Sequence, residues 1–123
     1  MNRWVLLEHK IHSKNLINIH YDLLIEDKLD CYTWKIYEIP IINGCLVKIV
    51  KQSQHRLIWL TRIECELSNN RGFVKRLDHG TFSYVAPTEN SQELKYILNG
   101  KLLNGLLTID ENFCHLTNTI NLF

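Results

Sequence analysis

The sequence predicts an all-β fold, a compact single-domain β-barrel with at most one short helix. Short segments rich in β-branched and aromatic residues recur between turn signals along the chain, a pattern typical of antiparallel strands. No long segment keeps the 3.6-residue apolar periodicity of an amphipathic helix. About ten short strands favour a closed or nearly closed barrel, because a flat sheet would leave long edges exposed.

Each expected strand is bounded by residues that favour turns. The strands are expected, in order, at residues 3–9, 19–26, 31–38, 44–51, 56–64, 72–77, 80–86, 94–98, 102–110 and 113–120. The turn signals between them include Asp27-Lys28, Pro40 with Asn43-Gly44, Ser68-Asn69-Asn70, Asp78-His79-Gly80 and residues 87–91. The sequence Asp78-His79-Gly80 is therefore interpreted as a hairpin turn between two strands.

Two Asn-Gly pairs near the end of the chain tolerate positive φ angles. Asn99-Gly100 and Asn104-Gly105 lie too close together to close two full hairpins, so one pair is expected to mark a bulge at a barrel corner. Residues 91–98 fit either a short helix or a strand.

Length and charge limit the possible functions. A chain of 123 residues is expected to form one domain, residues 1–123. Fourteen Lys and Arg against 13 Asp and Glu give no basic field over the whole surface, so any nucleic acid must bind a local patch.

No apolar run approaches the ~20 residues of a membrane span, and the start does not resemble a signal peptide. Four scattered cysteines without a C-x-x-C pair argue against a zinc ribbon. We expect a cytoplasmic monomer without membrane contact.

The most informative motif is His20-Tyr21-Asp22, inside an expected strand, with His9 at the end of another. Residues two apart on a strand face the same side, so His20 and Asp22 project together while Tyr21 faces away. An imidazole and a carboxylate in this arrangement supply two ligands of a divalent-metal site, and a neighbouring strand can add the third. The alternative is an ordinary half-buried strand whose His and Asp hydrogen-bond each other, since H-x-D is common.

Six segments in order carry a wider pattern. They are Trp4–His9, Ile19–Glu26 (IHYDLLIE), Tyr32–Trp34, His55–Leu60, Asn70–Phe82 with its G-x-V-x-x-x-D-x-G-T-F run, and Tyr96–Leu107 with its two Asn-Gly pairs. Together they resemble the 3′-phosphoesterase domain of bacterial DNA ligase D, and more closely the small stand-alone proteins related to it. The resemblance implies a small β-barrel with a crescent-shaped groove. It also implies a metal-dependent hydrolase that removes 3′-phosphates or 3′-ribonucleotides in DNA repair.

The resemblance also assigns roles to residues. It places metal ligands on His9, His20 and Asp22, with Mn²⁺ as the expected ion and Zn²⁺ as a plausible one, because an N,N,O ligand set also suits tetrahedral geometry. It places a phosphate-binding arginine on Arg56, whose forked guanidinium suits a phosphate. Arg71, in a polar turn, is a second candidate phosphate contact. The expected partners are DNA or RNA–DNA 3′ ends and DNA repair proteins.

The chain departs from the family pattern at three places. Leu24 stands where the family has a phosphate-binding arginine, and Glu64 falls on or near a family histidine that can donate a proton. His55 is the substitute donor we select, so the expected catalytic residues are His20, Arg56 and His55. Adjacent strand residues face opposite ways, so His55 and Arg56 can both serve only if the strand twists or bulges.

The third departure is the segment between His9 and His20, which is about five residues longer than in the family and is interpreted as a loop. It contains His12 as a rival ligand, expected to be solvated.

Two functions follow from these observations. The first is a phosphoesterase weakened by the loss of an arginine, in which case a Leu24→Arg substitution is expected to raise activity. The second is a catalytically silent module on the same barrel that binds nucleic acid or a repair partner.

Overall fold

The computed structural model describes residues 2–68, 71–88 and 90–119 and confirms the all-β prediction. Its elements are β1 (Arg3–Ser13), β2 (Leu16–Glu26), β3 (Cys31–Ile36), β4 (Val47–His55), the 3₁₀ helix η1 (Leu57–Leu60), β5 (Glu64–Leu67), β6 (Gly72–Val85), β7 (Leu94–Asn99), β8 (Asn104–Ile109) and β9 (Phe113–Thr117). Helix η1 has only four residues, and within the described residues no helix is long and apolar enough to cross a membrane.

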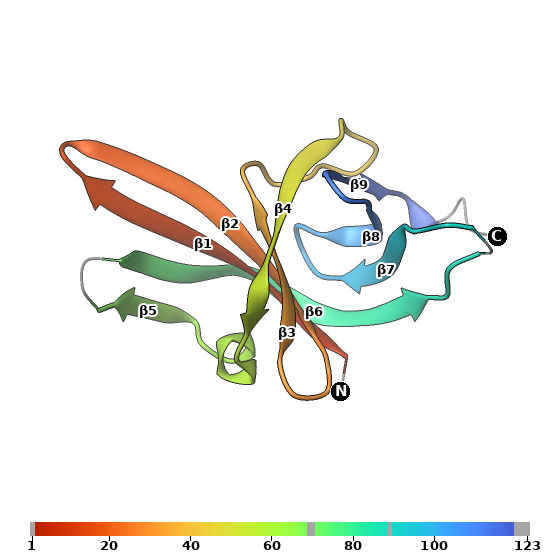
Figure 1. Cartoon of the computed structure of the whole chain (residues 1–123), viewed down its shortest axis with the longest axis horizontal. Helices are drawn as coiled ribbons and strands as arrows, with labels where there is room; N and C mark the ends of the chain where they lie inside the picture. Colours follow the sequence, from red (N-terminus) through yellow and green to blue (C-terminus); the bar gives the residue numbers. More distant parts are fainter. Residues whose placement is uncertain (1, 69–70, 89, 120–123) are drawn as a thin grey trace.

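The strands form one antiparallel sheet that closes on itself. Their order is β1-β2-β3-β4-β9-β8-β7-β6-β5, and β1 also pairs with β6. All strands except β5 therefore lie in a closed ring, and β5 extends the sheet along the free part of β6. In Figure 1 the ring members β7, β8 and β9 lie on the right, and the β1–β2 hairpin and the β5–β6 pair extend to the left. Ring closure removes most of the unpaired strand edges that a flat sheet would expose.

Two apolar cores lie on opposite faces of β1 and β2, because alternate residues of a strand face opposite ways. The barrel interior holds the larger core, whose buried members are Trp4, Leu6, Leu23, Ile25, Trp34, Ile36, Val47, Ile49, Tyr96, Leu98, Leu103, Leu107, Ile109, Cys114 and Leu116. The smaller core lies outside the ring and comprises Val5, Leu7, Leu24, Cys31, Leu60 and Val74. Helix η1 supplies Leu60 and thus covers the smaller core from outside.

The predicted strand at residues 56–64 is wrong. β4 extends to His55, η1 occupies Leu57–Leu60, and β5 begins only at Glu64. In a 3₁₀ helix residues three apart lie above one another. Leu57 and Leu60 therefore face the same side, and both pack on the smaller core. A strand here would turn its alternate apolar residues away from that core.

The predicted hairpin at Asp78-His79-Gly80 is also wrong, because β6 continues through these residues as one strand of 14 residues. Asp78 is 4% exposed, and its carboxylate accepts four backbone N–H groups instead of closing a turn. Oδ1 accepts from His79 (2.9 Å) and Lys101 (3.0 Å), and Oδ2 accepts from Leu102 (2.8 Å) and Leu103 (2.9 Å).

Gly80 is required because the last residue of β7 packs closely against β6. A Cβ atom on Gly80 would lie 1.9 Å from the carbonyl oxygen of Asn99. Asp78 thus holds the loop of residues 100–103 against β6, and Gly80 makes room for the end of β7.

The expected bulge at one of the Asn-Gly pairs is not observed. Leu98 pairs with Gly105 and Asn99 with Asn104 in continuous register. The register shifts lie elsewhere, at Leu6/Leu7 opposite β6 and at Cys31/Thr33 opposite β4. Residues 94–99 form strand β7, which settles the choice between helix and strand in that segment.

The segment between His9 and His20 is not an inserted loop. β1 and β2 continue as a long hairpin that ends at Lys14-Asn15, where both residues have positive φ (45° and 66°), as in a type I′ turn. His12 lies within β1, opposite Ile17, and is exposed. The additional residues therefore lengthen two paired strands.

The Arg3–Glu26 ion pair joins the first strand to the end of the second. Arg3 donates to the Glu26 carboxylate through its backbone N (2.9 Å), Nε (3.0 Å) and Nη2 (2.9 Å). These hydrogen bonds hold the pKa of Glu26 below its ordinary value.

We expect Glu26→Gln to reduce the free energy of unfolding by about 0.5–1 kcal/mol at neutral pH, since the arginine is partly solvated. A depressed carboxyl pKa stabilises the fold above the ordinary pKa of 4.5, and this contribution is lost as the pH falls through the folded-state value. Urea titrations between pH 7 and pH 3 should therefore show wild type and variant converging in acid. A difference that stays constant with pH would contradict the assignment.

Candidate metal centre and phosphate groove

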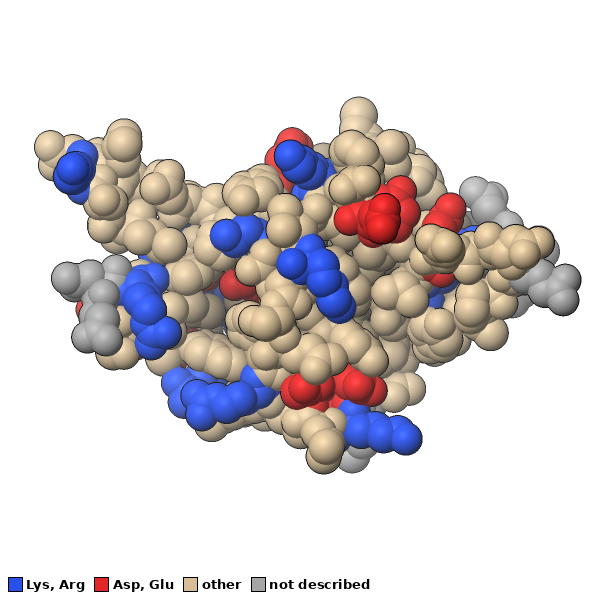
Figure 2. All heavy atoms as spheres, viewed as in Figure 1, with Lys and Arg blue, Asp and Glu red and all other residues tan. Residues whose placement is uncertain are grey.

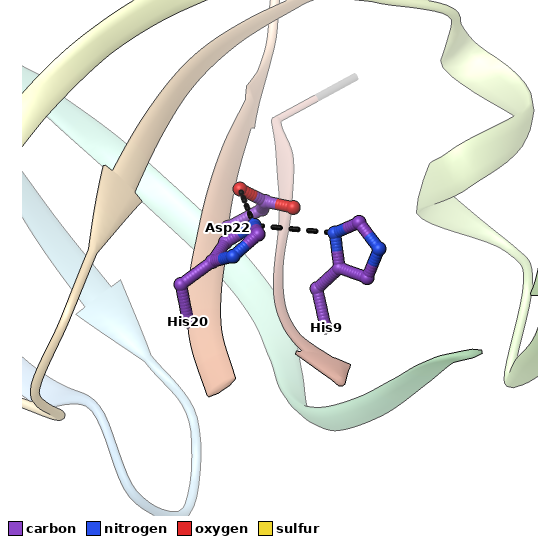
Figure 3. Close-up of side chains that lie close together, drawn as sticks. All are labelled: His9, His20 and Asp22. Atoms are coloured by element: carbon purple, nitrogen blue, oxygen red, sulfur yellow. Dashed lines mark hydrogen bonds and ion pairs between the residues drawn. The ribbon is translucent and has the colours of Figure 1, made fainter. Parts of the chain in front are cut away.

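Three side chains converge where β1 and β2 leave the barrel. His9 on β1 pairs directly with His20 on β2, and Asp22 follows two residues later on the same face. His9 Nδ1 lies 3.2 Å from His20 Nε2, and His20 Nε2 lies 3.5 Å from Asp22 Oδ1. Figure 3 shows these three groups pointing toward one another. The structure therefore brings together all three residues that the sequence analysis assigns to a metal.

A backbone carbonyl fixes the tautomer of His9. Its Nε2 lies 2.7 Å from the carbonyl oxygen of Arg71. A carbonyl only accepts hydrogen bonds, so Nε2 carries the proton and donates it. In the neutral imidazole, Nδ1 then presents its lone pair toward His20 and Asp22. Metal-binding histidines are commonly oriented by such a bond from the other ring nitrogen to a carbonyl or carboxylate.

Gly72 allows this close approach between β1 and β6. It has a φ of +107°, and a Cβ atom there would lie 2.3 Å from the carbonyl oxygen of Lys10 and 3.1 Å from His9 Nε2. Any larger residue would push β6 away from His9. The glycine that follows Arg71 is thus part of the local geometry that orients His9.

His20 favours the neutral form that a metal requires. Burial lowers its pKa, and the charges of His9 and Lys35 act in the same direction, whereas Asp22 raises it. The rings of His9 and His20 meet edge to face, with centroids 4.6 Å apart. A neutral imidazole offers a lone pair at neutral pH without first losing a proton.

The donor set fits a divalent ion. One ligand atom from each of His9, His20 and Asp22 lies within 4.8 Å of the others. Ligand bonds of about 2.1 Å place neighbouring ligand atoms about 3.0–3.4 Å apart at octahedral or tetrahedral angles. The His9–His20 and His20–Asp22 separations, 3.2 and 3.5 Å, are close to this range, and the third pair of atoms lies within 4.8 Å. The same contacts also satisfy the side chains as a hydrogen-bonded cluster, which is the alternative raised by the sequence. Three protein ligands would leave open positions for water and a phosphoryl oxygen.

A groove of about 480 Å³ lies beside the cluster. Its lining residues come from four elements and one turn: His9, Ile11, His55, Arg56, Trp59, Leu67 and Arg71. A smaller recess of about 60 Å³ joins His9 and Asp22 to His55 and Trp59. The groove thus contains both arginines that were assigned to phosphate, together with the proposed proton donor.

His55 and Arg56 reach the same groove because the backbone changes direction between them. β4 ends at His55, and Arg56 is the extended N-cap residue of η1, with φ −68° and ψ 150°. The change of backbone direction that the proposed roles of His55 and Arg56 both require is therefore supplied by the junction between β4 and η1. Arg71 is oriented locally, since its Nε and Nη2 donate to the carbonyl and hydroxyl oxygens of Ser68 at 3.0 and 3.1 Å.

Leu24 does not line the groove. It is fully buried (0% exposed) in the smaller core beneath η1. An arginine at this position would place a guanidinium among aliphatic side chains, which is strongly unfavourable without a partner. The expectation that Leu24→Arg raises activity is therefore corrected, because this substitution would displace η1 and with it Arg56.

Two further candidates lie away from the cluster. Glu64 is exposed at the start of β5, opposite Lys75 of β6. His12 is three residues beyond His9 on the same strand, so it faces the opposite side of the sheet. It lines a separate recess with Phe73. His12 is therefore excluded as an alternative ligand to His9 in this cluster.

Trp59 lines the groove, although its place in the sequence indicated a core residue. This half-buried residue lines both the groove and the small recess, and the Arg62 guanidinium lies 5.0 Å from its ring centroid. Trp59 lies in a helical turn, one residue before the buried Leu60. Because residues 56–64 were predicted to form a strand, this position was not expected.

On the face shown in Figure 2, Lys and Arg gather on the half of the molecule that carries η1, β5 and the β1–β2 hairpin, whereas most acidic groups lie on the other half.

Comparisons with known proteins assign no family. A scan against protein-family models finds no match to the chain, and a search of curated proteins finds none either.

Proposed function

We propose that the protein is a divalent-metal phosphoesterase that acts on 3′ ends of nucleic acid, related to the 3′-phosphoesterase domain of DNA ligase D. One observation carries the proposal: the donor atoms of His9, His20 and Asp22 converge at the edge of a groove that also contains Arg56 and Arg71. A metal site beside two guanidinium groups suits a phosphate ester, whose charge both can neutralise.

The residues of the site divide the chemistry between them. His9, His20 and Asp22 would hold Mn²⁺, or Zn²⁺, which supplies a Lewis acid and a water of lowered pKa. Arg56 and Arg71 hold the phosphate oxygens along the groove. Water attacks phosphorus and loses a proton to solvent, the bond from phosphorus to the 3′ oxygen breaks, and His55 in its imidazolium form would supply the proton that the leaving oxygen takes up. Trp59 and Leu67 limit the access of other water to the site.

The buried Leu24 limits the expected rate. A family member with an arginine at this position has one more charged contact to the phosphate, and loss of one such contact commonly reduces a rate about 10²-fold. We therefore expect slow hydrolysis. The same observation, together with the apolar part of the groove lining (Ile11, Trp59, Leu67), favours the second candidate function, a silent module that binds nucleic-acid ends.

Replacing Arg56 tests the enzyme function. The substrate is a labelled primer-template that ends in a 3′-phosphate or a 3′-ribonucleotide, and release is measured with Mn²⁺ present. We expect Arg56→Ala to lower the rate about 10²-fold and leave metal binding unchanged, because Arg56 contacts only the phosphate. Arg76→Ala is the matched control, since Arg76 lines a different recess.

Equal rates for Arg56→Ala and wild type would contradict the role of Arg56. Tight binding of the primer-template without any release by wild type would replace the enzyme with the binding module.

A further inference from the structure

A second pocket opens at one end of the barrel, away from the metal cluster. Its volume is about 500 Å³, within the range of about 300–1,000 Å³ typical of small-molecule sites, and barrel mouths are frequent locations of such sites. Ile25 of β2 lines it, whereas Asp22, three residues earlier, faces the other side of the same strand. The proposed phosphoesterase chemistry therefore does not use this pocket.

The pocket has an accessible aromatic wall. Tyr96 is 4% exposed, and it packs edge to face against Phe82 with ring centroids 5.4 Å apart. Tyr84 packs on Tyr96 at 5.6 Å and remains 51% exposed. The buried ring thus holds a neighbouring ring in place while one side of it stays open. Such a surface suits stacking of a flat aromatic ligand.

Lys51 supplies a positive charge to the same pocket. It follows the buried Val47 and Ile49 at alternate positions of β4, so it faces inward. Its Nζ lies 4.6 Å from the ring centroid of Tyr32 and 4.1 Å from that of Trp34. In the part of the chain that the structure describes, no hydrogen bond or ion pair to an anion accompanies these contacts. Partial burial, which removes water from the Lys51 ammonium, lowers its pKa. This cation therefore has no anionic acceptor among the described residues.

The acidic groups at the rim have partners. Glu26 is bonded to Arg3, and Asp27 accepts a hydrogen bond from the Tyr32 hydroxyl, which raises the pKa of that phenol. An aromatic pocket with carboxylates can also hold a quaternary ammonium. Here the Lys51 ammonium already lies over the rings of Tyr32 and Trp34, and it would repel a positively charged ligand. The charge distribution therefore favours an aromatic ligand with an anionic group.

We propose that this pocket binds a nucleotide unit, with the base stacked on Tyr84 and the phosphate on Lys51. Asn2 and Asp27 also line the pocket, and their side chains offer a donor and a further acceptor for the edge of the base. The unit can be a free mononucleotide or an unpaired nucleotide of a strand, and both present the same base and phosphate. The site is separate from the metal cluster and needs no metal.

Calorimetric titration of AMP and adenosine in EDTA tests the proposal. We expect Lys51→Gln to weaken AMP binding about tenfold and leave adenosine binding unchanged, because only the phosphate contact is lost. Tyr84→Ala should weaken both ligands at least about fivefold, the effect of losing one stacked base. Lys48→Gln is the matched control, because Lys48 is exposed on the other face of β4. Circular dichroism establishes that each variant is folded.

A five-nucleotide oligoadenylate distinguishes the two sources. Tighter binding than AMP, still weakened by Lys51→Gln, assigns the pocket to a strand, and equal affinity assigns it to a mononucleotide. The proposal is overturned if neither ligand binds at millimolar concentration, if both variants bind as wild type does, or if choline binds more tightly than AMP. Since EDTA removes the metal, these results are independent of the proposed phosphoesterase.

Discussion

Replacing Asp78 with alanine is expected to lower the free energy of unfolding by about 3–5 kcal/mol, a large part of the stability of a small domain. The Asp78 carboxylate accepts N–H groups from His79, Lys101, Leu102 and Leu103, and it is almost completely buried. Alanine would leave these donors without an acceptor in a space that water does not readily enter, and each unpaired buried donor is costly. Urea denaturation measures the difference.

Asp110 provides a matched control for this substitution. It accepts the N–H groups of Asn112 and Phe113 at 2.8 and 2.7 Å, but in an exposed turn. Asp110→Ala should lower the stability much less than Asp78→Ala, because water can replace the exposed carboxylate. If the two variants lose equal stability, burial of the Asp78 network is not what stabilises the β7–β8 loop.

The second large effect concerns the metal. We expect Mn²⁺ at a hundredfold excess over its dissociation constant to stabilise the wild-type fold by about 2.7 kcal/mol, because the ion binds the folded chain. His20→Ala and Asp22→Ala should each remove this stabilisation, and with it the release of a 3′-phosphate. Each change deletes one of the three proposed protein ligands. Thermal denaturation with and without Mn²⁺ gives the shift.

His12→Ala is the control for the metal experiment. His12 lies on the same hairpin, faces the other side of β1 and is exposed, so its removal should leave the Mn²⁺ shift intact. A shift that survives both His20→Ala and Asp22→Ala would place the metal elsewhere.

The strand pattern and the shared face of His20 and Asp22 were predictable from local sequence. His20 and Asp22 share a face because side chains alternate along a strand, and the resemblance supplied His9 as the third member. The exact pairing of His9 with His20 depends on the turn at Lys14-Asn15. That turn lacks the glycine that usually marks a two-residue hairpin, so the paired strands were read as a loop.

The features that were mispredicted depend on partners distant in sequence. From its local sequence Asp78 is typical of a turn. Its role as an acceptor for the N–H groups of residues 101–103 depends on the three-dimensional fold. Leu57 and Leu60 fit a strand as well as a helix, and only the external core under η1 decides between them. The burial of Leu24 follows from that same core, which alternation along β2 does not reveal.

Diffraction from a crystal soaked in Mn²⁺, recorded near the manganese absorption edge, would locate the ion. We expect one strong anomalous peak about 2.0–2.3 Å from His9 Nδ1, His20 Nε2 and an Asp22 carboxylate oxygen, with the bond from His9 Nε2 to the Arg71 carbonyl retained. No peak at this position at saturating Mn²⁺, with His20 Nε2 still hydrogen-bonded to His9 Nδ1, would contradict this expectation.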